Sequence, residues 1–183
     1  MSDVGKQSAA GQGLLPSSAA VFGASGGLRK ALVHSLAARV CDRIYAGSRS
    51  GAGFASEKVV SFAFDLEDEA SIAEAAQSMR DKPPQWVIVA SGVLSLEEGQ
   101  GPERTYKRLD PEVMAKVLAI NTIGPALIAK HILPLMRRAD PFVFAALSAR
   151  VGSISDNGLG GWHSYRASKA ALNMLLKNFA IEM

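Results

Sequence analysis

The chain of 183 residues has the length of one ordinary globular domain, and 48% of its residues are hydrophobic while 20% are charged. This composition can fill a single large core and excludes a wholly disordered protein. The net charge of +3 is small and the basic residues are scattered, so we expect no nucleic-acid partner.

Residues 1–16 are rich in Gly, Ser, Gln and Ala and lack the apolar stretch of a signal peptide. We therefore expect a flexible tail followed by a single domain over residues 17–183. No apolar run approaches the ~18 residues of a membrane helix, so we expect a cytoplasmic protein with no membrane partner. The single Cys41 cannot form an internal disulfide, and the three histidines lack metal-ligand spacing, so we predict no metal site.

Short apolar runs alternate along the chain with longer amphipathic ones. The apolar runs predict strands over 19–22, 43–47, 58–64, 86–90 and 141–147. Helices are expected after the first strand to about residue 40, then over 67–80, 111–138 and from about 161 onward. Asp110 is the expected N-cap of the long third helix, with Pro111 at its first position. Continuously apolar strands indicate a parallel sheet covered on both faces, hence a three-layer, doubly wound, Rossmann-like α/β fold.

A glycine-rich turn connects the first predicted strand to its helix. Glycines at this place let the backbone turn tightly and approach a pyrophosphate, which then meets the N–H groups at the start of the helix. A turn that merely connects two elements is the alternative. The candidate cofactor-binding residues of this turn are Gly23, Ser25, Gly26, Gly27 and Leu28.

Ser48 and Arg49 follow the second predicted strand, where the adenosine ribose of a bound dinucleotide lies. An acidic residue at this place would hold the 2′-hydroxyl of NAD, whereas an arginine can pair with the 2′-phosphate of NADP. No acidic residue ends this strand, so the pattern favours NADP, with NAD as the alternative. Arg49 could also be an ordinary surface charge.

Tyr165 and Lys169 are four residues apart on the last predicted helix and therefore share one of its faces. A neighbouring ammonium stabilises a phenolate, so the tyrosine can pass a proton to or from a carbonyl oxygen while hydride moves at the carbon. An exposed pair without catalytic use is the alternative. The pair follows the fifth predicted strand and a polar Gly/Ser loop, and this context favours the catalytic interpretation.

Asn121 interrupts an apolar face inside the long third helix, where a buried polar side chain must find partners. Pro125 follows four residues later and has no N–H, so it cannot bond the carbonyl of Asn121 as an unbroken helix would. A proline kink with no functional content is the alternative.

These segments resemble the short-chain dehydrogenase/reductase family. Within it, Ser-Ala-Arg-Val-Gly-Ser-Ile (148–154) and Gly-Gly-Trp-His-Ser-Tyr (160–165) resemble the C-factor-type and sniffer-type carbonyl reductases. Gly23 and Gly27 occupy the first two places of the family's Gly-x-x-x-Gly-x-Gly motif, and Arg29 stands in the third. The catalytic helix reads Tyr-Arg-Ala-Ser-Lys-Ala-Ala-Leu-Asn. The resemblance implies an NADP(H)-dependent enzyme acting on a small carbonyl or alcohol. It makes Tyr165 the acid/base, Lys169 its tuning and ribose-binding partner, and Asn121 the holder of a relay water through its main-chain carbonyl.

The resemblance adds further cofactor positions. Asp65, with Leu66 after it, matches the family's adenine-contacting aspartate, although Asp65 could equally cap the next helix. Ala90, Ser91 and Gly92 stand where the family carries Asn-Asn-Ala-Gly, so the backbone can still approach the cofactor. We expect the asparagine contacts that brace the sheet to be lost.

The family's catalytic serine has no clear counterpart. Its usual place, three residues before Gly152, is Ala149. Ser148 is one residue early but sits at the carboxyl edge of the fifth strand, and we choose it as the group that steadies the substrate oxygen. Ser153 is the alternative if the loop folds back.

Family members continue beyond the catalytic helix with a strand, a substrate-covering segment and a last strand, so we expect the domain to be truncated at its C-terminus. The fifth strand would then be a sheet edge. These departures keep a rival hypothesis open, a cofactor-binding but non-catalytic regulatory or interaction module. The family's usual interface would make the protein a homodimer or homotetramer.

Overall fold

A computed structural model describes the chain from Pro16 onward, except residues 25–26, 40, 52, 97–100 and 137–138. Nearly all of the predicted tail therefore lies outside the described residues. The same holds for Ser25 and Gly26 of the predicted cofactor turn, and for the side chains of Leu28 and Arg29.

Five parallel strands form one sheet in the order β3-β2-β1-β4-β5. The register places Ala19 of β1 beside Ile44 on one side and beside Trp86 on the other. The chain adds β2 and β3 on one side of β1 and then crosses over to add β4 and β5 on the other side. The switch point of the sheet therefore lies between β1 and β4, and ligands of such sheets bind at the carboxyl ends of the strands that flank it. The strands are β1 Ser18–Phe22, β2 Arg43–Ser48, β3 Val59–Ala63, β4 Trp86–Val89 and β5 Val143–Ala146.

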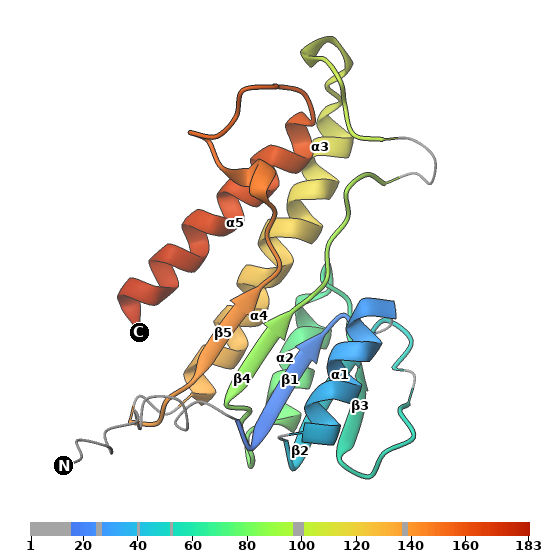
Figure 1. Ribbon diagram of the computed structural model, residues 1–183, viewed down its shortest axis with the longest axis vertical. Coiled ribbons are helices and arrows are strands. Elements are labelled where there is room, and N and C mark those ends of the chain that lie inside the picture. The colour runs from blue at the N-terminus through green and yellow to red at the C-terminus, as the bar shows by residue number, and fades with distance from the viewer. Residues whose placement is uncertain (1–15, 25–26, 40, 52, 97–100, 137–138) are drawn as a thin grey trace, which may run out of the picture.

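Helices cover both faces of this sheet, which confirms the predicted Rossmann-like fold (Figure 1). The helices are α1 Gly27–Arg39, α2 Glu69–Ser78, α3 Pro111–Leu118, α4 Gly124–Ile132 and α5 His163–Glu182. The described residues also form four short helical segments: η1 Tyr106–Arg108, η2 Ala119–Ile123, η3 Leu133–Leu135 and η4 Arg150–Gly152.

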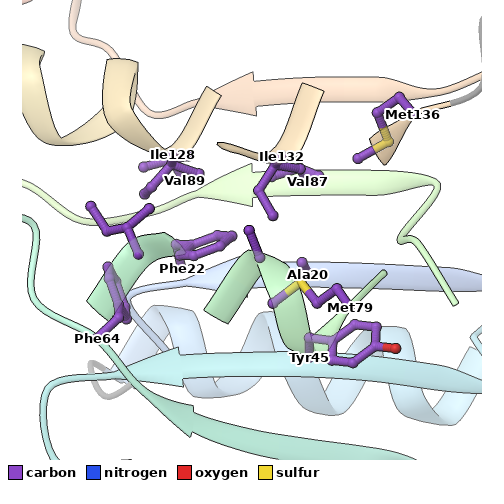
Figure 2. Close-up of a cluster of buried hydrophobic side chains, with 12 residues drawn as sticks. Ala20, Phe22, Tyr45, Phe64, Met79, Val87, Val89, Ile128, Ile132 and Met136 are labelled. Atoms are coloured by element: carbon purple, nitrogen blue, oxygen red, sulfur yellow. The ribbon is translucent and has the colours of Figure 1, made fainter. Parts of the chain in front are cut away.

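The two faces of β1 support separate hydrophobic clusters. Val21 faces α1 and packs with Val33 of that helix. Phe22 faces the other way, toward Ile72 of α2 and Ile128 of α4, in the cluster that Figure 2 shows. Every residue of β1 is buried, so its continuously apolar sequence follows from its central position between two helical layers.

The helix starts follow the expected capping chemistry. Asp110 Oδ1 accepts hydrogen bonds from the backbone N–H groups of Glu112 (2.9 Å) and Val113 (3.0 Å), as predicted. For α2 the cap is Asp68, whose side chain accepts from the N–H of Ala70 at 3.0 Å. The alternative interpretation of Asp65 as the cap of this helix is therefore wrong.

The predicted helix over 111–138 is not uniform. A single π-helical turn, η2, separates α3 from α4, and in it the N–H of Gly124 donates to the carbonyl of Ala119, five residues earlier. This wider turn immediately precedes Pro125, whose ring and missing N–H disfavour regular α-helical bonding to the preceding turn. The described helix ends at Leu135 in a 3₁₀ turn.

The stretch Pro111–Leu135 is long and apolar enough to cross a membrane by length and composition alone, contrary to the expectation from the sequence. In the structure it is a core helix of the domain. Ile128 and Ile132 are fully buried in the cluster of Figure 2, and α4 packs against α2.

Ile128→Ala should lower the free energy of unfolding by about 2–5 kcal/mol, because the fully buried side chain leaves a cavity between α4 and the sheet. Ile154→Ala is the matched control, since that side chain is 85% exposed and its loss should change stability by less than about 0.5 kcal/mol. Urea denaturation followed by circular dichroism measures both. Similar losses in the two variants would contradict the assignment of this core.

Candidate active site

Gly23 directly follows β1 at the switch point and contacts the ends of β2 and β4. Its φ of +96° is one that side-chain-bearing residues rarely adopt, and a Cβ there would lie 3.0 Å from the backbone nitrogen of Ser91. Its N–H donates to the carbonyl of Gly47 at the end of β2. Only glycine fits at this point, and the turn that follows lies directly against the ends of β2 and β4.

Ser91 braces the sheet at the end of β4. Its hydroxyl donates to the carbonyl of Phe22 on β1 (3.3 Å), next to the backbone bond from Ala90 to the same carbonyl (2.9 Å). We expected bracing contacts to be lost with the family's asparagines. In place of an asparagine, the serine hydroxyl joins β4 to β1.

The residues predicted to meet the adenosine half of a cofactor lie at the same edge. Ser48 ends β2 and is buried, while Arg49 beside it is exposed. Asp65 is exposed, and its Oδ1 accepts from the N–H of Glu67 in the turn after β3 (3.0 Å). Leu66 packs against Gly124 of α4, where a Cβ would lie 2.7 Å from its side chain.

Lys169 is buried at the centre of the site. Only 4% of it is exposed, and its Nζ donates to the carbonyl of Leu147 after β5 (2.8 Å). A Cβ on Gly92 would lie 3.3 Å from this Nζ, so the backbone after β4 runs directly over the ammonium. Burial lowers the pKa of Lys169, because removal from water disfavours the charged form.

Tyr165 lies one helical turn before Lys169, as the spacing predicts. Its ring centroid is 5.8 Å from the Lys169 Nζ and 6.4 Å from the ring of Trp162. The tyrosine is half-buried, which leaves its ring partly open to solvent. The structure therefore brings the predicted acid/base pair together on one face of α5.

Asn121 ties three parts of the site to one another. Its Oδ1 accepts from the N–H of Val93 (2.8 Å), and its Nδ2 donates to the carbonyl of Val93 (2.8 Å) and to the hydroxyl of Ser168 (3.0 Å). The side chain is fully buried in the π-turn η2. It thus joins the segment after β4 to α5, and it belongs to the same cluster as Lys169.

Neighbouring contacts reinforce this joint. The hydroxyl of Thr122 donates to the carbonyl of Ser168 (2.8 Å), and the hydroxyl of Ser168 donates to the carbonyl of Tyr165 (2.8 Å). Figure 1 shows the outcome, with α5 and α3 side by side above the carboxyl ends of β4 and β5.

The structure does not bring Ser148 to Tyr165. Its hydroxyl donates to Oδ1 of Asn173 (2.7 Å), which lies eight residues and about 12 Å further along α5 than Tyr165. Ser153 contacts its own loop: it accepts from the N–H of Asp156 (3.3 Å) and lies 3.4 Å from the hydroxyl of Ser155. In this structure both hydroxyls therefore contact partners other than Tyr165.

Glu103 and Ser164 were not predicted. The carboxylate of Glu103 accepts hydrogen bonds from both the N–H and the hydroxyl of Ser164. Burial raises the pKa of Glu103, but the bonds from Ser164 and the nearby charge of His163 outweigh it, so the pKa is lowered overall. The partners are 61 residues apart in the sequence. In the sequence near α5, the one sign of such a contact is that neither Trp162 nor His163 is a usual N-cap residue, so the cap has to come from elsewhere.

A cavity of about 960 Å³ lies between the segment after β4 and helix α3. Tyr165 and Lys169 are not among its lining residues, but Ser164, the residue before Tyr165, is. Its wall includes Leu94, Leu96, Arg104, Arg108, Val113 and Val117. Within the described ranges, no three His, Cys, Asp or Glu side chains lie close enough together to hold a metal ion.

The family model for short chain dehydrogenases matches residues 17–183. The chain is similar to 1-hydroxy-2-glutathionyl-2-methyl-3-butene dehydrogenase of Rhodococcus sp. (strain AD45). The two sequences are 31% identical over 160 residues, and the match covers 84% of this chain and 67% of that protein.

Two solved structures share the fold. NADPH-bound carbonyl reductase from chicken fatty liver is 25% identical with a TM-score of 0.77, covering 91% of this chain and 70% of that one. Carbonyl reductase Sniffer of D. melanogaster is 19% identical with a TM-score of 0.78, covering 91% and 75%.

Asn121→Ala should destabilise the fold by about 1–3 kcal/mol, because it leaves the N–H and carbonyl of Val93 without their side-chain partner. The N–H of Val93 should also exchange with deuterium faster than in the wild type. Asn178→Ala, an exposed amide on α5, is the control and should have little effect. Unchanged exchange at Val93 would show that Asn121 does not hold this segment.

Proposed function

Because this chain belongs to the short-chain dehydrogenase family and is thereby an oxidoreductase, we propose that it interconverts a carbonyl and an alcohol using NADP(H). The observation that carries the proposal is the buried Lys169 beside Tyr165, joined through Asn121 to the edge of the sheet where dinucleotides bind. Burying a lysine at the carboxyl edge of a parallel sheet costs free energy, because the ammonium loses its water, and such groups usually serve a function.

The residues of this edge fit a dinucleotide. A Cβ on Gly23 would collide with Ser91, and one on Gly92 would crowd Asn121 and Lys169, so these glycines let the turns after β1 and β4 pack closely at the edge where a dinucleotide would bind. The glycine turn of Gly23, Ser25, Gly26, Gly27 and Leu28 would hold the pyrophosphate at the start of α1. The adenosine would lie against Ser48, Arg49, Asp65 and Leu66, and the nicotinamide half against Ala90, Ser91, Gly92, Tyr165 and Lys169.

Arg49 supports NADP over NAD. It is exposed at the end of β2, where it can pair with a 2′-phosphate, and no carboxylate ends this strand to prefer a 2′-hydroxyl. The carbonyl reductase from chicken fatty liver, which shares this fold, was solved with NADPH bound.

When bound, NADP(H) supplies or accepts the hydride at the substrate carbon. Tyr165 donates a proton to the carbonyl oxygen during reduction and takes it back during oxidation. Lys169 favours the phenolate form by its positive charge, and its buried ammonium stays close to the tyrosine because Leu147 holds it by a hydrogen bond.

Asn121 would hold the water that reprotonates the pair. All three polar bonds of its side chain go to Val93 and Ser168, so this water would meet its main-chain carbonyl in the π-turn rather than the amide. Pro125 supports this arrangement, since it offers no N–H to that carbonyl.

Ser148 remains the least supported part of the predicted site. To steady a substrate oxygen beside Tyr165, its hydroxyl would have to leave Asn173 and turn toward the start of α5. This placement favours the second candidate function, a cofactor-binding module without turnover. The predicted cytoplasmic location and the homodimeric or homotetrameric state stay predictions.

Tyr165→Phe should reduce carbonyl reduction by at least roughly 100-fold, because the proton donor is lost while the ring and its packing remain. Lys169→Met should give a loss of similar size. The measurement is NADPH oxidation, followed by absorbance over a panel of aldehydes and ketones, with Tyr106→Phe, an exposed tyrosine of η1, as the control. Tight NADPH binding without turnover in the wild type would favour the non-catalytic module instead.

Arg49→Ala should weaken NADPH binding about ten- to a hundredfold and leave NADH binding nearly unchanged, since a charge-assisted bond to the 2′-phosphate is lost. Fluorescence titration of both cofactors measures the ratio of their affinities. Arg80→Ala removes an exposed arginine at the end of α2 and should leave the ratio unchanged. An equal loss for both cofactors would reject the phosphate contact.

A further inference from the structure

Helix α5 begins without a cap of its own. The residue before it, Trp162, has a left-handed φ of 55° and makes no side-chain cap bond. The first turn, which starts at His163, contains no acidic residue. The first N–H groups of a helix have no partner within the helix and need acceptors from elsewhere. This turn carries Tyr165, so the acceptors that complete it also fix the proposed acid/base.

Glu103 supplies these acceptors from a distant segment. One carboxylate oxygen accepts from the N–H of Ser164 (3.3 Å), and the other accepts from the hydroxyl of Ser164. The main-chain carbonyl of Glu103 accepts from the N–H of Trp162. A single residue thus caps the helix with both its side chain and its backbone.

The segment that carries Glu103 and the residues just before α5 approach each other closely enough to need glycine. Gly161 has a φ of +65°, and a Cβ on it would lie 3.3 Å from the carbonyl oxygen of Arg104. Ser164 is 2% exposed, so the groups that donate to Glu103 are buried. The contact is therefore part of the folded domain and not a chance surface pair.

Charge favours the same contact. The N-terminus of a helix carries partial positive charge, and an anion stabilises it. The hydrogen bonds from Ser164 and the charge of His163 keep the pKa of Glu103 below its usual value despite burial, so the group is ionised at neutral pH.

The segment that carries Glu103 starts at the cofactor edge. Residues 92–96 leave the sheet at Gly92 and are held at Val93 by Asn121, and residues 101–103 reach the start of α5 at Glu103. The cavity of about 960 Å³ lies along this segment, and Glu103 and Ser164 are both part of its wall. The carboxylate therefore links the wall of a ligand-sized cavity to the turn that carries Tyr165.

We propose that Glu103 is a positioning residue of the reaction, whose carboxylate fixes the first turn of α5 and with it the hydroxyl of Tyr165. This inference rests on the proposed function. Among the described residues, Glu103 accepts hydrogen bonds from Trp162 and Ser164 and not from Tyr165, so its effect belongs to the placement of the tyrosine.

The test compares Glu103→Ala, Glu103→Gln and the wild type, with Glu112→Ala as the matched control. Glu112 is an exposed carboxylate in the first turn of α3, so its removal takes the same charge from another helix start. Glu103→Ala should lower kcat by about 10- to 100-fold, since a misplaced acid/base is costly, and should change the Kd for NADPH by less than about twofold. Glu103→Gln keeps one acceptor oxygen and should recover part of kcat.

Ser164→Ala completes the test as a double-mutant cycle. If Glu103 acts through Ser164, the double variant should lose no more kcat than Glu103→Ala alone, so the two effects do not add. Additive losses would mean that Glu103 acts by another route and would overturn the assignment.

Hydrogen exchange separates the failure of this inference from that of the proposed function. In Glu103→Ala, the N–H groups of residues 162–166 should exchange faster, while those of residues 170–180 should not change. An active wild type whose kcat survives Glu103→Ala overturns the role of Glu103 alone. An inactive wild type overturns the proposed function and the positioning role together, and faster exchange would then show that the cap itself still exists.

Discussion

The bonds made by the amide of Asn121 are the constraint on which the rest of the site depends. One buried side chain holds both backbone groups of Val93 and the hydroxyl of Ser168. The amide donates two hydrogen bonds through Nδ2 and accepts one through Oδ1, all within the protein, which suits a fully buried position. The bonds fix the exit of β4 relative to α5, so the edge that would take a dinucleotide and the helix that carries the acid/base pair form one rigid unit.

Lys169 shows what this rigidity permits. A lysine is rarely buried, because transferring its charge from water is costly unless it is hydrogen-bonded. Here the carbonyl of Leu147 accepts one bond, and Gly92 leaves the space that the ammonium occupies. Burial lowers the pKa of Lys169, and its Nζ lies 5.8 Å from the ring centroid of Tyr165.

Much of this could be predicted because the signals are local. The apolar run of β1, the cap of α3 at Asp110 and the spacing of Tyr165 and Lys169 each depend on residues close in sequence, and the structure has all three. The five strands fall within two residues of the predicted bounds, since continuous apolar runs are clear signals.

What could not be predicted depends on contacts between distant segments. The cap of α5 joins residues 61 apart, and no local pattern marks Glu103. The orientation of Ser148 is set by Asn173, 25 residues away on α5, and the brace from Ser91 to Phe22 spans 69 residues. The π-turn follows from Pro125, but the sequence predicts only that regular bonding fails there, not that the helix widens without breaking.

The central claim is that Tyr165 and Lys169 serve hydride transfer between NADP(H) and a carbonyl carbon. Deuterium transfer tests it most directly: wild-type protein is incubated with NADPH deuterated at C4 of the nicotinamide and a carbonyl substrate, and the product is examined by mass spectrometry. The account predicts one deuterium on the carbon that bears the new hydroxyl, at a rate that falls sharply in Tyr165→Phe. Alcohol that forms without the label, or labelled alcohol that forms equally fast in Tyr165→Phe, would contradict it.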